Sequence, residues 1–249
     1  MLELYHWEPN GDSLKMIIAL KEKGVPYTSH YVDLLGLEHH GEAFKAAADG
    51  GRVPLMVENG AVLKDSQFAL QYLAEAYEPR LAPTDPAGWY DIQDWTGFAN
   101  TLGANVRALG WHTVTSPGMP EAERKDFLDR SAKLPKPAVM AGWAQVTSDA
   151  EASEDQLRLA RERIADAVAR IEKQLTGKDW LVGDAYSVAD INVFAHAHVL
   201  PRLTPEIVNA QKTPNVMAWL KRVGERPAVR DALRARHSNR AGDVYAPMV

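Results

Sequence analysis

The stretch from Gly50 to Leu73, GGRVPLMVENGAVLKDSQFALQYL, constrains the fold more than any other part of the sequence. Two short apolar runs flank Asn59-Gly60, a dipeptide that favours the tight turn of a β-hairpin, so two antiparallel strands are expected. The Asp65-Ser66 pair then precedes a helical segment. The apolar members of that segment are Phe68, Leu70, Tyr72, Leu73 and Tyr77. The stretch therefore predicts a hairpin followed directly by a helix.

The residues before the hairpin extend this pattern to a small α/β domain over residues 1–80. The expected elements are a strand at 2–7, a helix over 13–24, a strand at 26–34 and a weakly helical segment at 39–51. Gly24 marks the end of the first helix, since glycine is the residue that most readily ends one. The order β-α-β-α-β-β-α is typical of an α/β domain.

The rest of the chain predicts an all-α domain over residues 89–249. Residues 81–88 form a connector, within a stretch that contains three prolines and a glycine. Helical patterns follow at 89–109, 153–175, 214–226 and 228–236, and the segment from Thr113 to Ser153 is expected to be partly helical. One face of the 153–175 helix carries Leu157, Ile164, Val168, Ile171 and Leu175.

Composition excludes several classes of function. The net charge of -5 offers no footprint for a nucleic-acid partner. No apolar run reaches the length of a membrane span, and the N-terminus lacks an export signal, so the cytoplasm is the expected location. The chain has no cysteine. Its eight histidines do not show the spacing that places two metal ligands on one helical face, so no metal site is predicted.

Two motifs carry both a structural and a functional interpretation, and a third carries a structural one. Pro54 either begins an edge strand with an ordinary trans bond, or forms a cis bond that presents the backbone of Val53 to an extended ligand. The Asp65-Ser66 pair caps a helix, or holds the α-amino-acid end of a ligand. The Ser187-x-x-Asp190 pattern predicts a capping box with a structural role.

Aromatic residues suggest a substrate pocket. Trp7, Trp111 and Trp143 are candidates for its walls, with ordinary core or surface positions as the alternative. His112 is a candidate for orienting a polar group of the substrate, and an ordinary surface or interface histidine is the alternative.

Taken together, RVP, KDSQFALQYL, the proline-rich connector and WLVGDAYSVADINVFAHA resemble the glutathione transferase superfamily over nearly the whole chain. The resemblance implies an α/β plus all-α fold, with an N-terminal thioredoxin-like domain and a C-terminal helical bundle. It implies that Val53, beside a cis Pro54, pairs with the cysteinyl backbone of glutathione. It further implies that Asp65 and Ser66 hold the γ-glutamyl end. The resemblance places His40 and Arg52 at the glycine end, where a guanidinium suits a carboxylate.

The segments NGDSLKM, LEHHGEAF and LGWH are similar to bacterial β-etherases, which cleave lignin-derived β-aryl ethers with glutathione. The glutathione thiolate would attack the carbon beside a ketone and expel a phenol. Ser13 would donate to the sulfur, near the positive end of the first helix. Asp12 departs from the family pattern, which tends to have Asn there, and a carboxylate beside the sulfur would raise the thiol pKa. Ala48-Asp49 also departs from an Asn-Pro pair found in many relatives.

Two other functions stay open. One is a general glutathione transferase acting on other electrophiles or hydroperoxides. The other is a non-catalytic binding protein with the same fold. The absence of cysteine excludes the relatives that use a cysteine for thiol exchange. The resemblance implies a homodimer, or a heterodimer with a paralogue, and a small aromatic ether as the substrate.

Overall fold

The computed structural model describes residues 1–42, 44, 52–134 and 153–238. It begins with a four-stranded sheet in the order β2-β1-β3-β4. The strands are β1 (Leu2–His6), β2 (Thr28–Tyr31), β3 (Leu55–Glu58) and β4 (Ala61–Leu63). β1 runs parallel to β2 and antiparallel to β3, with Tyr5 opposite Leu55. Strands β3 and β4 form the predicted hairpin, and Asn59 adopts the positive φ of 49° that its turn requires.

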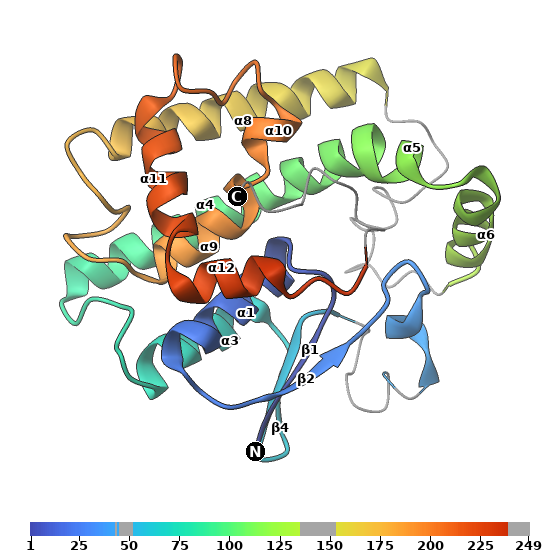
Figure 1. The fold of residues 1–249 in the computed structure, drawn as a ribbon, viewed down its shortest axis with the longest axis horizontal. Helices are drawn as coiled ribbons and strands as arrows, with labels where there is room; N and C mark the ends of the chain where they lie inside the picture. Colours follow the sequence, from blue (N-terminus) through green and yellow to red (C-terminus); the bar gives the residue numbers. More distant parts are fainter. Residues whose placement is uncertain (43, 45–51, 135–152, 239–249) are drawn as a thin grey trace.

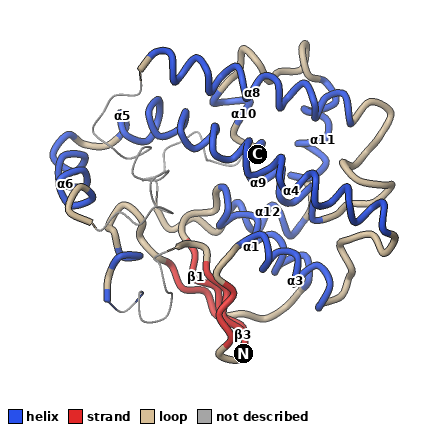
Figure 2. The backbone as a smooth tube through the Cα atoms, turned by 180° about the vertical axis from the view of Figure 1, so that it is seen from behind, coloured by secondary structure: helices blue, strands red, loops and turns tan. Residues whose placement is uncertain are grey.

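Two helices complete this half of the molecule. Helix α1 (Gly11–Lys23) ends at Gly24, which has a left-handed conformation, and it packs against α3 (Ser66–Ala76). Figures 1 and 2 show both helices between the sheet and the helical domain. The short η1 helix (Glu38–His40) begins the segment that was expected to be weakly helical, and most of the remainder lies outside the described residues.

Helix α3 buries only some of its apolar side chains. Its buried side chains are Ala69, Leu70, Leu73 and Ala74. Phe68 and Tyr72, which the apolar pattern included, are 71% and 40% exposed. They lie four residues apart on the opposite side of the helix, so they do not belong to the core.

The second half consists of helices, and the described part of residues 86–238 contains no strand. The first elements are α4 (Pro86–Gly110), the π-helical turn η2 (Trp111–Thr115), α5 (Ser116–Gly118) and α6 (Glu121–Ser131). They are followed by α8 (Glu154–Gln174), α9 (Val188–Ala197), α10 (Leu200–Leu203), α11 (Pro214–Gly224) and α12 (Pro227–Arg234). Because α4 begins at Pro86, it starts inside the stretch assigned as the 81–88 connector. In the described residues, no helix is both long enough and apolar enough to cross a membrane.

Helix α9 is the centre of the helical domain and carries the predicted capping box. The Ser187 hydroxyl accepts from the amide of Ala189, and the Asp190 carboxylate accepts from the amide of Ser187. The same carboxylate accepts from Trp219 Nε1 at 2.9 Å. Asp190 is fully buried, so these donors replace the water that it loses. The motif is structural, as the sequence indicated.

The two halves pack closely through α1. This helix contacts α9 and α12, and Arg226 at the start of α12 forms a two-pronged ion pair with Glu22. The last described residues also contact the sheet domain. Glu8, which follows β1 and is 2% exposed, accepts from Tyr31 Oη, from the amide of His237 and from Ser238 Oγ.

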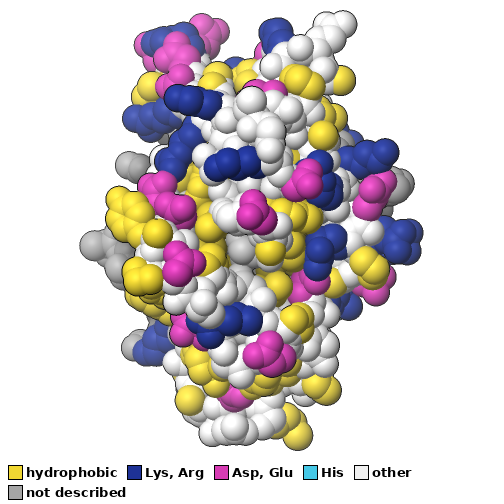
Figure 3. Space-filling model, turned by 90° about the vertical axis from the view of Figure 1, so that its left-hand side faces the viewer, with side chains coloured by type: hydrophobic (Ala, Val, Ile, Leu, Met, Phe, Trp, Pro, Cys, Tyr) yellow, Lys and Arg dark blue, Asp and Glu magenta, His cyan; other side chains and the backbone are white. Residues whose placement is uncertain are grey.

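The surface shown in Figure 3 carries acidic and basic side chains that alternate, with apolar side chains between them. No large area of a single sign of charge is visible on that face.

Candidate functional site

A cavity of about 420 Å³ lies where the first turn of α1 meets α4 and α9. The predicted site residues that line it are Trp7, Asp12, Ser13, Arg52, Val53, Pro54, Asp65, Ser66 and Trp111. The sheet domain and the helical domain therefore both contribute to it. Its volume lies within the range of sites for small organic ligands.

Ser13 occupies the first turn of α1. The helix begins after Asn10, whose side chain makes no capping hydrogen bond, and its first internal bond runs from the amide of Leu14 to the carbonyl of Asn10. The amides of Gly11 to Ser13 therefore have no partner within the helix, which makes this end attractive to an anion. The backbone amide of Trp7 donates to Ser13 Oγ at 3.1 Å. Among described residues this is the only hydrogen bond of the Ser13 side chain, so its proton remains available to a ligand.

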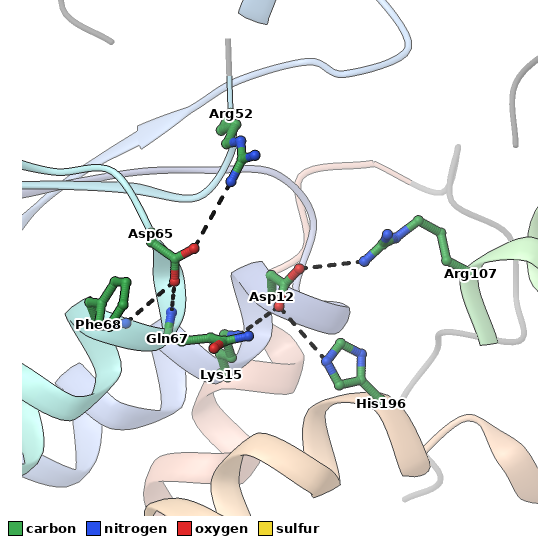
Figure 4. A network of polar contacts seen from close by, with 8 residues as sticks. All are labelled: Asp12, Lys15, Arg52, Asp65, Gln67, Phe68, Arg107 and His196. Carbon is green, nitrogen blue, oxygen red and sulfur yellow. Dashed lines mark hydrogen bonds and ion pairs between the residues drawn. The ribbon is translucent and has the colours of Figure 1, made fainter. Parts of the chain in front are cut away.

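Asp12 lies next to Ser13 and interacts with three side chains (Figure 4). Its Oδ1 lies 2.7 Å from Nζ of the fully buried Lys15, and its Oδ2 lies 3.5 Å from a terminal nitrogen of Arg107. His196 Nε2 is 3.8 Å from Oδ1. Burial alone would raise the pKa of Asp12, but the nearby positive charges outweigh it and hold that pKa well below its usual range. Asp12 is therefore ionised at neutral pH.

His196 fills the space between α1, α4 and α9. It is 4% exposed, and burial lowers its pKa to about 3. It is therefore neutral at neutral pH, and the cations beside Asp12 are Lys15 and Arg107. Gly103 in α4 leaves room for the imidazole, because a Cβ there would lie 2.6 Å from His196 Cε1. With two cations and one anion, the cluster around Asp12 carries one net positive charge.

The opposite wall of the cavity contains the Val53-Pro54 pair, whose peptide bond is cis. The functional interpretation of this pair required that geometry. Asp65 is the N-cap of α3, as its structural interpretation stated, and its Oδ1 accepts from the amides of Gln67 and Phe68 at 2.8 and 3.4 Å. Its other oxygen lies 4.0 Å from Arg52 (Figure 4). This wall therefore offers a carboxylate, a guanidinium and a helix N-terminus together.

The aromatic candidates separate into three groups. Trp7 and Trp111 both line the cavity, and Trp111 packs against Phe127 with ring centroids 5.4 Å apart. His112 is not among the lining residues. Trp143 lies outside the described residues. His40, which was predicted to contact glutathione, is not among the lining residues, whereas its neighbour His39 is.

Sequence reasoning missed Arg107 and His196. Arg107 stands four residues before Trp111, so both lie on one side of α4 and its continuation, and this spacing was a usable signal. His196 is a polar residue within the apolar run INVFAHA, which was a second signal. Lys15 gave no signal, because a lysine in a helix is ordinarily exposed.

Comparison with known proteins places these features in a wider context. Residues 13–76 match the model of the glutathione S-transferase N-terminal domain, and residues 134–227 match that of the C-terminal domain. Protein LigF of Sphingobium sp. strain SYK-6 is 29% identical over 240 residues, which cover 92% of both chains. Glutathione S-transferase GstA of Escherichia coli is 26% identical over 233 residues, covering 92% of this chain and 96% of GstA.

Solved structures agree with these matches. The crystal structure of the β-etherase LigF from the same Sphingobium strain superposes with a TM-score of 0.82, covering 93% of this chain and 98% of LigF. A glutathione transferase from Burkholderia graminis, crystallised with two glutathione molecules bound per subunit, has a TM-score of 0.70 and 25% identity. That similarity covers 94% of this chain and 88% of the other.

Proposed function

The chain belongs to the glutathione S-transferase superfamily, and from that premise we propose that it is a β-etherase that uses glutathione to cleave a β-aryl ether next to a ketone. Glutathione-dependent transferase activity is the coarser function, with glutathione as the co-substrate. The similarity to LigF, whose structure is described as that of a β-etherase, supports the finer one.

The single observation that carries the proposal is the hydrogen bond from the Trp7 amide to Ser13 Oγ. It turns the oxygen lone pair of Ser13 toward the protein and leaves the hydroxyl proton for the glutathione sulfur. The free amides at the start of α1 would also stabilise negative charge on the glutathione sulfur. Together they stabilise the thiolate, which is the nucleophilic form of glutathione.

The other contacts with glutathione follow from the walls of the cavity. The backbone of Val53 would pair with the cysteinyl residue, and Asp65 and Ser66 at the start of α3 would hold the γ-glutamyl end. An ammonium group suits the Asp65 carboxylate, and the α-carboxylate suits the amides of the helix N-terminus. Arg52 would bind the glycine carboxylate.

A carboxylate beside the sulfur would by itself raise the thiol pKa, but Asp12 lies within a cluster whose net charge is positive. Lys15 and Arg107 more than neutralise Asp12, so the local field favours a thiolate. This weighs against a non-catalytic binding protein.

In the reaction, the thiolate sulfur forms a bond to the β-carbon and the carbon–oxygen bond of the ether breaks. The bonding electrons leave with the phenolate, which then takes a proton from water. Trp7 and Trp111 would pack against the aromatic rings. A general transferase is the second candidate, and the similarity to the glutathione S-transferase GstA supports it.

The test is a substrate panel with the purified full chain and reduced glutathione. The proposal expects release of phenol from an α-aryloxy ketone, with formation of the matching glutathione thioether by mass spectrometry. Turnover of chlorodinitrobenzene or cumene hydroperoxide without cleavage of any ketone ether would favour the general transferase. If glutathione gives no ultraviolet thiolate absorbance on binding, the catalytic proposal is wrong.

A further inference from the structure

Arg107 lines the cavity, and so far only its charge has been given a role, in neutralising Asp12. It lies in α4, on the wall that the helical domain contributes, and its side chain is 45% exposed. Figure 4 shows it extending toward Asp12 from the side opposite to Asp65 and Arg52. It thus faces the start of α1 from the last turn of α4, four residues before Trp111 in the chain.

The interaction with Asp12 leaves most of the guanidinium unused. The nitrogen–oxygen distance of 3.5 Å is at the limit of a hydrogen bond, and Asp12 already has a much closer cation in Lys15. A guanidinium has five N–H groups. In the part of the chain that the structure describes, Asp12 is the only polar partner of Arg107.

The geometry of the displacement indicates which substrate atom these donors reach. When the sulfur attacks the β-carbon, the ether oxygen leaves from the far side of that carbon. The ketone is attached at the side, between the attacking and leaving atoms. Arg107 and Ser13 line the same cavity, on walls contributed by α4 and α1. A substrate attacked by the sulfur beside Ser13 would therefore have Arg107 at the side of its β-carbon, where the ketone is attached.

We propose that Arg107 is a catalytic residue that donates a charge-assisted hydrogen bond to the ketone oxygen of the substrate. The inference rests on the proposed function. As the carbon–sulfur bond forms and the carbon–oxygen bond breaks, the adjacent carbonyl withdraws electron density and its oxygen becomes more negative. A fixed cationic donor stabilises that oxygen more in the transition state than in the free substrate. The carbonyl is unchanged in the product.

The experiment compares electrophiles with and without the ketone. Wild type, Arg107→Gln and Arg107→Lys are assayed with an α-aryloxy acetophenone, with phenacyl chloride and with nitrobenzyl chloride, which has no carbonyl. The assays are run above the thiol pKa that each variant shows by ultraviolet titration. This removes the effect of Arg107 on the amount of thiolate.

The matched control is Arg161→Gln. Arg161 lies in α8, outside the cavity lining, with 43% exposure and a similarly long ion pair of 3.9 Å to Glu206. It is expected to react like wild type with all three electrophiles.

Arg107→Gln is expected to lose about 50-fold in kcat/KM with both ketones and less than about threefold with nitrobenzyl chloride. Arg107→Lys keeps the positive charge but lacks the planar set of N–H donors of the guanidinium. We therefore expect an intermediate loss of kcat/KM, about tenfold, with the two ketones only. The lysine variant also provides the test if the glutamine variant fails to fold. An equal loss on all three electrophiles would overturn the role of Arg107. In another outcome, the wild type cleaves no ether while Arg107→Gln still loses rate with phenacyl chloride and not with nitrobenzyl chloride. That result would overturn the ether specificity and support the role of Arg107.

Discussion

Asp12 and Lys15 form an ion pair of 2.7 Å within the first turns of α1, and the lysine is completely buried. Removing the carboxylate leaves that ammonium without a counter-charge. Asp12→Asn is expected to lose about 3 kcal/mol of unfolding free energy, measured by urea denaturation. It is also expected to lower the pKa of bound glutathione, because the remaining cations are no longer opposed. The double variant Asp12→Asn/Lys15→Met should recover most of the stability, and an Asp12→Asn variant as stable as wild type would contradict the pairing.

Ser13 is expected to act through its hydroxyl proton. Ser13→Ala removes one donor to the thiolate, which should raise the pKa of bound glutathione by about one unit and lower the rate at neutral pH about tenfold. Ultraviolet titration of the thiolate measures the first effect directly. Ser13→Thr keeps the hydroxyl and is the control that should stay close to wild type. An unchanged thiol pKa in the alanine variant would remove Ser13 from the mechanism.

Asp65 is expected to have two roles that a matched variant separates. Asp65 is the N-cap of α3 and Asp85 is the N-cap of α4, and each carboxylate accepts a hydrogen bond from at least one backbone amide. Only Asp65 lines the cavity. Alanine at either position should cost about 1 kcal/mol of stability. Only Asp65→Ala should also weaken glutathione binding, measured by calorimetry. Equal affinity in the two variants would leave Asp65 as a helix cap alone.

Buried histidines predict that the protein loses stability in mild acid. Burial lowers the pKa of His39 and His196 to about 3, and that of His198 to about 4. Each is neutral in the fold but binds a proton once unfolded below about pH 6.5. Stability is therefore present above that pH and falls as the pH drops from about 6.5 toward 4.

Asp190 acts in the opposite sense, because burial raises its pKa to about 6 although four hydrogen bonds lower it. Near pH 5 the unfolded chain thus binds about two protons more than the fold, so the unfolding free energy should fall by roughly 3 kcal/mol per pH unit. Urea titrations at a series of pH values measure this slope, and His198→Gln should flatten it. A stability that does not change between about pH 7 and 5 would contradict the buried, neutral histidines.

Features set by neighbouring residues were predictable from the sequence. The Asn59-Gly60 turn and the Asp65 and Ser187 caps each depend on a few consecutive residues, and all are confirmed. Periodicity identified helix α3 correctly but not which apolar side chains face the core. Phe68 and Tyr72 share one side of that helix, and composition alone does not orient a helix that is apolar on several sides.

The polar cluster of the site depends on contacts between distant parts of the chain. Asp12 meets Arg107 across 95 positions, and it meets His196 from a third helix. No local pattern encodes such a meeting, because it arises only when the helical domain packs against α1. Sequence analysis could therefore recognise Asp12 as unusual but could not find the cations that compensate it.

Three groups donate hydrogen bonds to the carboxylate of Glu8, and they show that the sheet domain depends on residues distant in the sequence. The residue that precedes Glu8, Trp7, forms part of the cavity wall, and two of the donors come from positions 237 and 238. A fragment that ended with the sheet domain would lack His237 and Ser238, so the buried carboxylate of Glu8 would lose two of its hydrogen bonds. The segment between β1 and α1, which contains Glu8, would lose these contacts. Residues 237 and 238, far from the sheet in the sequence, are thus part of the support of the cavity wall.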